Sequence, residues 1–101
     1  MTTWFISRHK GAIDWVQQKN IKIDFFITHL NENILFKKGD TVYGSLPVGL
    51  IYKLNQQGAN YVNIELNVPE SYRGKELSYH QLNNFGASLA GYEVKKTSVE
   101  L

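Results

Sequence analysis

The chain has 101 residues, of which 43% are apolar and 20% are charged, and its net charge is +2. This composition is typical of one soluble globular domain with a modest core, so we expect a single domain over residues 1–101. The small charge argues against a binder of long nucleic acid, and the lack of cysteine and of any apolar run near the ~20 residues of a membrane span favours a cytoplasmic protein without disulfides.

The chain opens with an apolar strand that ends in a cationic turn. Residues 2–7 are rich in β-branched and aromatic residues, which predicts a buried strand. The next residues, 7–11, read Ser-Arg-His-Lys-Gly and lead into an amphipathic helix over residues 10–19. Such a turn presents backbone N–H groups and basic side chains at one edge of a sheet, which suits a phosphate. The alternative is a plain connection with solvated Arg8 and Lys10.

The middle of the chain repeats this pattern of strand, turn and helix. Apolar residues predict a second strand over residues 21–29 and a third over residues 41–44. In the turn after the third strand, Ser45 is placed to cap the next helix and Pro47 to lie in its first turn, where a missing N–H costs nothing. We expect that helix to end at Gly58.

The last third of the chain carries the clearest local signature. Residues 60–68 predict a fourth strand, which is followed by a polar loop. Ser78 and Gln81 have the spacing of a capping box, which predicts that a helix starts at Ser78. We expect Gly91 to end this helix and residues 92–99 to add an edge strand.

Strands that alternate with helices indicate an α/β fold. Right-handed crossovers then give a largely parallel sheet with helices on both faces. The turns that follow the strands share one edge of such a sheet, and ligands bind there. We therefore expect residues 7–11, 44–47 and 67–74 to converge at that edge, with Thr28 and His29 beside them.

The familiar catalytic motifs are missing from the sequence. There is no HExxH, and the three histidines, His9, His29 and His80, lack the spacing of metal ligands, so we expect no metal and no cofactor. The sequence also lacks the G-x-S-x-G elbow of serine hydrolases and the phosphate-binding P-loop. What remains at the expected sheet edge is a set of hydrogen-bond donors and cations.

Those donors and cations suit a phosphodiester. Arginine can bind phosphate through two hydrogen bonds, and a preorganised donor cluster can stabilise charge that develops on phosphorus-bound oxygens. We expect Arg8 and Arg73 to act catalytically in this way, and His9 to give acid or base help. The expected ligand-binding residues are Ser7, Gly11, Gly44, Ser45, Leu46, Pro47 and Ser71. Each also has a structural alternative, such as a helix cap for His9 or a solvated loop cation for Arg73.

An ordered set of short segments resembles a known family. The segments are Ser7-Arg8-His9, Gly11-Ala12-Ile13, Trp15, His29-Leu30, Gly39-Asp40-Thr41-Val42, Gly44-Ser45-Leu46-Pro47-Val48, Gly58-Ala59 and Arg73-Gly74-Lys75-Glu76-Leu77-Ser78. Together they resemble the small type III CRISPR accessory proteins of the Csx series, member sixteen, over nearly the whole chain. That family is similar to CARF-domain proteins, which implies a Rossmann-like, CARF-like fold and a homodimer that binds a cyclic oligoadenylate across its axis.

The resemblance implies a ring nuclease of antiviral defence. Such a hydrolase opens cyclic tetra-adenylate, the second messenger of type III CRISPR complexes, and so switches off the nucleases that the messenger activates. The implied reaction is metal-independent attack of a ribose 2′-hydroxyl on the neighbouring phosphate, which leaves 2′,3′-cyclic phosphate ends. Two alternatives stay open: a module that binds or sequesters the ring without cutting it, and an unrelated Rossmann-like nucleotide-binding domain. The resemblance itself assigns no role to any residue.

Overall fold

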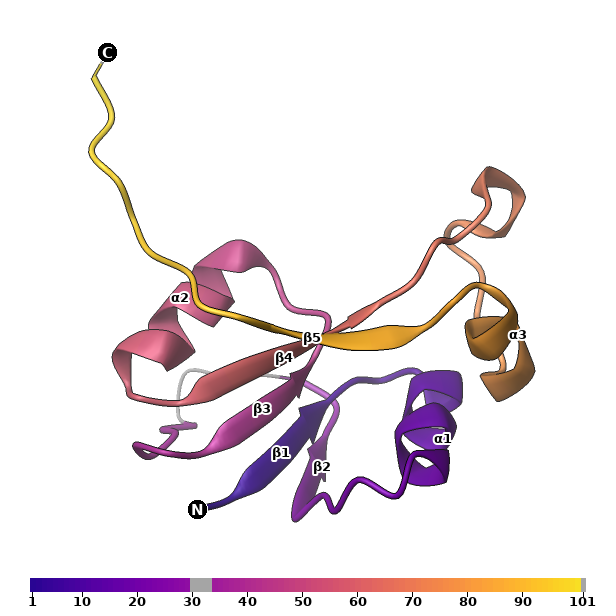
Figure 1. Ribbon diagram of the computed structural model, residues 1–101, viewed down its shortest axis with the longest axis horizontal. Coiled ribbons are helices and arrows are strands. Elements are labelled where there is room, and N and C mark those ends of the chain that lie inside the picture. The colour runs from indigo at the N-terminus through magenta and orange to yellow at the C-terminus, as the bar shows by residue number, and fades with distance from the viewer. Residues whose placement is uncertain (30–33, 101) are drawn as a thin grey trace.

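A five-stranded sheet forms the centre of the computed structural model, which describes residues 1–29 and 34–100 (Figure 1). The strands are β1 (Thr3–Ile6), β2 (Phe25–Ile27), β3 (Thr41–Gly44), β4 (Asn60–Glu65) and β5 (Ser88–Tyr92). Their order is β2-β1-β3-β4-β5; β1 to β4 run parallel, and β5 pairs antiparallel with β4. The prediction of a mainly parallel α/β sheet is confirmed, and the fold is consistent with a Rossmann-like arrangement. Leu30, which belongs to the resemblance, lies outside the described residues.

Helices cover both faces of the sheet. α1 (Lys10–Gln18) and α3 (Tyr79–Asn84) pack against each other on one side, and α2 (Val48–Gln56) lies on the other (Figure 1). A short 3-10 helix, η1 (Glu70–Tyr72), interrupts the loop between β4 and α3. None of the helices in the described ranges is both long enough and apolar enough to cross a bilayer.

Each face of the sheet has its own hydrophobic core. The cluster under α2 contains Ile6, Phe36, Val42, Ile51, Leu54, Ala59 and Tyr61. The cluster under α1 and α3 contains Phe5, Trp15, Val16, Ile64 and Leu82. Phe5 and Ile6 belong to different clusters because successive side chains of a strand point to opposite faces. The continuous apolar run of β1 is therefore the pattern of a strand that is covered on both sides.

The last helix and the last strand differ from the sequence prediction. α3 ends at Asn84, well before Gly91, because the chain turns at Gly86, whose φ of 73° lies in the left-handed region. The last strand, β5, therefore begins early and spans Ser88–Tyr92, so the prediction of a strand over residues 92–99 is wrong.

Three other strands are shorter than predicted, and β1 lacks one residue at each end of its predicted range. β2 covers only Phe25–Ile27, because Ile21 and Ile23 pack against the core under α1 instead of joining the ladder. β4 ends at Glu65, because the backbone N–H of Asn67 bonds to the loop after α3. In contrast, β3 has the predicted bounds, and Gly58 follows α2 with a φ of 91°, as expected for a glycine at a helix end.

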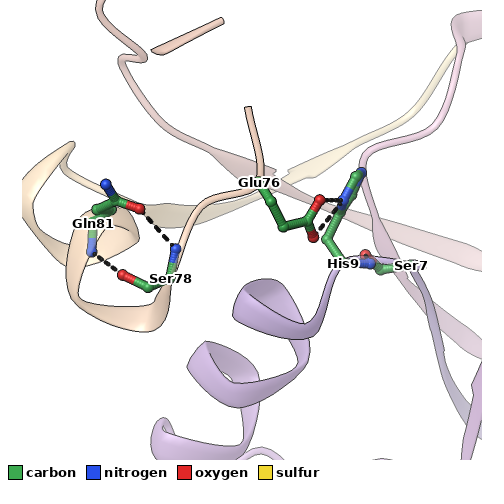
Figure 2. A network of polar contacts seen from close by, with 5 residues as sticks. All are labelled: Ser7, His9, Glu76, Ser78 and Gln81. Carbon is green, nitrogen blue, oxygen red and sulfur yellow. Dashed lines mark hydrogen bonds and ion pairs between the residues drawn. The ribbon is translucent and has the colours of Figure 1, made fainter. Parts of the chain in front are cut away.

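The predicted capping box is present at the start of α3. The Ser78 Oγ accepts a hydrogen bond from the Gln81 N–H at 3.2 Å, and the Gln81 Oε1 accepts one from the Ser78 N–H at 2.9 Å (Figure 2). α3 has only 6 residues, so its start is a large part of its structure. The box fixes the direction in which the chain enters this helix.

Loss of this cap should destabilise the protein measurably. We expect Ser78→Ala to lower the free energy of unfolding by about 1 kcal/mol, because a backbone N–H of the first turn loses its acceptor. Urea denaturation measures the change, and Ser98→Ala, in the exposed C-terminal segment, serves as the control. Equal midpoints for the two variants would contradict a contribution from the cap.

Candidate functional site

A cavity of about 620 Å³ lies at the carboxyl edge of the sheet, where β1 and β3 end. The strand order reverses at this point, since β1 has β2 on one side and β3 on the other. Open α/β sheets bind their ligands at such a reversal, because the chain leaves the two neighbouring strands in opposite directions. The cavity therefore lies where the sequence predicted that the turns would converge.

The lining combines donors and cations with apolar side chains. The polar lining residues are Ser7, Arg8, His9, Thr28, His29, Ser45 and Lys75. The apolar lining comes from several distant parts of the chain and includes Ile6, Leu46, Leu50, Ile64, Leu66, Leu77 and Leu82. Within the described residues the lining contains no Asp or Glu, so the cavity favours an anion that also carries apolar surface.

Most of the predicted site residues line this cavity, and three do not. Those that line it are Ser7, Arg8, His9, Gly44, Ser45, Leu46 and Pro47. Ser71 and Arg73 are exposed in the η1 region, which projects away from the sheet (Figure 1). Lys75 supplies the cation from this loop instead, because the start and the end of the loop line the cavity, at Leu66, Val68 and Lys75, whereas its middle does not. The catalytic and binding roles of all these residues stay predictions.

Gly11 is the third residue outside the lining, and packing explains its glycine. It is buried at the start of α1, where an added Cβ would lie 1.8 Å from the carbonyl oxygen of Leu77. No side chain fits at that distance, so glycine allows α1 to lie directly against the chain that enters α3. Gly11 thus contributes to the site without lining the cavity, because it allows the start of α1 to pack against the chain at Leu77.

The turn after β3 is held by a buried tyrosine. The Tyr61 hydroxyl accepts a hydrogen bond from the Leu46 N–H at 2.9 Å and donates one to Asn63 Oδ1 at 2.6 Å. Burial raises the pKa of Tyr61, an effect that the bond from Leu46 only partly offsets, so the hydroxyl stays protonated and keeps both bonds. This network fixes one wall of the cavity from the neighbouring strand.

The prediction that Ser45 caps α2 is wrong. The helix begins at Val48, and its N-cap residue is Pro47, which therefore precedes the first turn. Ser45 lies too far before the helix to reach its first N–H groups, and its Oγ donates a hydrogen bond to the Ile64 carbonyl at 3.5 Å instead. Gly44 permits the close approach of β1, since an added Cβ would lie 2.9 Å from the carbonyl oxygen of Ile6.

His9, which lines the cavity, forms a pair with Glu76, which is not part of the lining. The His9 Nδ1 lies 2.9 Å from both carboxylate oxygens of Glu76, and the His9 backbone N–H donates to Ser7 Oγ at 3.1 Å (Figure 2). The two paired side chains are 54% and 62% exposed, so their contact adds little to stability. Sequence reasoning missed Glu76, because 67 positions separate it from His9 and no motif joins them. The sequence features that bear on this pairing are Gly11, which allows α1 to contact Leu77, and the capping box at Ser78, which starts α3.

Within residues 1–29 and 34–100, no group of three or more His, Cys, Asp or Glu side chains is arranged to hold a metal ion. The expectation of metal-independent chemistry stays a prediction, because the reaction itself is untested.

Comparison with known proteins identifies a family. The model of a family described as "Putative CRISPR-associated protein (Cas_VVA1548)" matches residues 4–95. No curated protein and no solved structure matches significantly. The family match includes all the residues that line the cavity and all five strands except Thr3, the first residue of β1.

Proposed function

Because the chain belongs to the Cas_VVA1548 family of CRISPR-associated proteins, we propose that it binds and cleaves cyclic tetra-adenylate, the messenger of type III CRISPR systems. The observation that carries the proposal is the cavity at the carboxyl edge, with Arg8 and Lys75 in its lining and no acidic lining residue in the described ranges. The resemblance of the ordered segments to a ring nuclease family supports the same function. In this function the protein would end the signal that activates the defence nucleases.

The composition of the cavity suits a nucleotide. Arg8 can bind a phosphate through two parallel hydrogen bonds, and Lys75 adds a flexible positive charge. The leucines of the lining offer apolar surface to an adenine base. Hydrogen-bond donors in the first two turns, such as the Ser7 and Ser45 hydroxyls, can bind ribose or phosphate oxygens.

The size of the cavity favours a dimer. Cavities of about 300–1,000 Å³ hold drug-sized ligands, and a cyclic tetranucleotide is several times larger than these. One cavity of about 620 Å³ can therefore hold only part of the ring. A homodimer with two-fold symmetry would present two such cavities to a ligand that has matching symmetry, so the mild charge of the chain is doubled where it is needed.

The proposed reaction uses the ligand's own nucleophile. A ribose 2′-hydroxyl attacks the adjacent phosphorus when it is held in line with the leaving 5′-oxygen, and no metal is required for this geometry. Arg8 stabilises the negative charge that develops on the phosphoryl oxygens. His9, at the rim of the same cavity, assists proton transfer.

The direct test is cleavage of labelled cyclic tetra-adenylate with a chelator present. We expect the wild type to give linear products with 2′,3′-cyclic phosphate ends, and Arg8→Ala and His9→Ala to slow single-turnover cleavage at least about tenfold. Circular dichroism checks that both variants remain folded, and Lys53→Ala, an exposed cation on α2 outside the cavity lining, is the control.

The outcomes separate the proposed enzyme from its alternatives. Tight binding of the ring without turnover by the wild type would favour the sequestering module. A wild type that binds no cyclic oligoadenylate would overturn the proposal, and unchanged rates in both variants would remove Arg8 and His9 from the mechanism.

A further inference from the structure

The contact between His9 and Glu76 fixes the proton on one nitrogen of the histidine ring. An ionised carboxylate can only accept hydrogen bonds, so the Nδ1 that lies 2.9 Å from both Glu76 oxygens must carry a proton. In a neutral imidazole the other nitrogen, Nε2, then holds a free lone pair. Within the described residues Nε2 has no hydrogen-bond partner. His9 lines the cavity, so a proton acceptor is available at its rim.

The backbone that follows Glu76 is held by two sets of contacts. The capping box of Ser78 and Gln81 fixes the chain just after Glu76 (Figure 2). Between Glu76 and Ser78, the Leu77 side chain packs against the core under α1. The Leu77 carbonyl lies directly against Gly11. The exposed carboxylate is therefore carried by a well-anchored segment, which also includes the cavity residue Lys75.

Stability alone does not account for this pair. Exposed ion pairs contribute about 0–1 kcal/mol, and both side chains here are more than half exposed. The pair instead has the arrangement of a base and its orienting carboxylate, in which the carboxylate selects the tautomer and stabilises the protonated ring. From this geometry we propose, on the basis of the proposed function, that His9 Nε2 is the base of the reaction and that Glu76 is its positioning residue.

The step balances without a further reactant. A bond forms between the 2′-oxygen and phosphorus, and the bond between phosphorus and the 5′-oxygen breaks. His9 Nε2 takes the proton of the 2′-hydroxyl, and Glu76 stabilises the imidazolium. The imidazolium of His9 then returns the proton through solvent to the 5′-oxygen, which leaves as a hydroxyl. The other end of the opened oligoadenylate is a 2′,3′-cyclic phosphate.

A double-mutant cycle in the full-length protein tests the coupling of the two residues. We expect Glu76→Ala to slow single-turnover cleavage of cyclic tetra-adenylate about tenfold with little change in ring affinity, and to have no further effect in a His9→Ala background. Glu76→Gln, which keeps a hydrogen-bond acceptor, should retain more activity than Glu76→Ala. The control is Glu70→Gln, an exposed glutamate of the same loop outside the cavity lining.

Two results would overturn the proposal while leaving the ring nuclease intact. One is a wild type that cleaves cyclic tetra-adenylate no faster than Glu76→Ala. The other is a double variant in which the rate losses caused by Glu76→Ala and His9→Ala are fully additive. A wild type that cleaves no ring at all contradicts the proposed function itself, so the two failures are distinguishable.

The tautomer gives a readout that needs no ligand. Two-dimensional ¹⁵N–¹H spectra of the neutral His9 ring should show the proton on Nδ1 in the wild type and in Glu76→Gln. In Glu76→Ala it should move toward Nε2, the form that free imidazole side chains prefer in water. An unchanged tautomer in Glu76→Ala would overturn the positioning role.

Discussion

Gly11→Ala should destabilise the protein by about 3 kcal/mol, because the new methyl group would lie 1.8 Å from a backbone oxygen of Leu77. A flexible side chain could move away from such a clash, but a carbonyl cannot without moving the segment that carries it. The cost is therefore separation of α1 from the start of α3, and the contact between His9 and Glu76 should be lost with it.

Gly49→Ala is the matched control for this substitution. Gly49 lies inside α2, and nothing is within 4 Å of its added Cβ. Alanine is the better helix former there, so this variant should be more stable by about 0.5–1 kcal/mol. Urea denaturation compares the two variants, and a Gly11→Ala midpoint at or above that of the wild type would contradict the close contact with Leu77.

Asp40→Ala should cost a similar amount, about 3 kcal/mol, because it removes a buried carboxylate and leaves three partly buried hydrogen bonds without their acceptor. Asp40 is 3% exposed. Its Oδ1 accepts from the Thr2 N–H at 2.9 Å, and its Oδ2 accepts from the Lys37 N–H at 3.0 Å and the Trp4 indole N–H at 3.2 Å. This carboxylate ties the start of β1 to the turn before β3. Asp40→Asn keeps one acceptor oxygen, so it should lower the free energy of unfolding less than Asp40→Ala does.

The same carboxylate makes stability depend on pH. Burial by itself raises the pKa of Asp40, but the hydrogen bonds from Lys37, Thr2 and Trp4, together with the positive charge of the N-terminus, outweigh burial and lower the pKa below its ordinary value of 3.8. Because the pKa of Asp40 is lower in the folded state than in the unfolded state, its carboxylate stabilises the fold fully above the unfolded-state pKa. This stabilisation is lost as the pH falls through the folded-state pKa. The stability difference between wild type and Asp40→Asn should therefore shrink below pH 3.8. A difference that stays constant with pH would contradict this assignment.

Local sequence patterns were enough for much of the fold. The apolar run of β1, the bounds of β3 and the capping box at Ser78 each depend on neighbours in the chain, and these were predicted correctly, whereas the cap at Ser45 was not. The end of α3 was not, because Leu82, Phe85 and Leu89 have helical spacing although Leu89 lies in β5. Spacing cannot show that the chain turns at a glycine with a positive φ.

The candidate site was predictable to the same extent. Carboxyl ends of parallel strands must share an edge, so the turns at Ser7 and Ser45 could be placed together from topology alone. The path of a long loop has no such rule, and this is why Lys75 lines the cavity in place of Arg73. The contact of His9 with Glu76 could not be predicted from the sequence, because it depends on how α1 and α3 pack against each other.

Two walls of the cavity lie far apart in the sequence, and this has consequences for when the cavity can form. The first comes from residues 6–12 and the second from residues 75–82, with three strands of the sheet made between them. A nascent chain holds the first wall long before the second has left the ribosome, and pairing between distant parallel strands is slow compared with helix formation. Unfinished chains and truncated products that lack α3 should therefore bind no ligand that needs both walls.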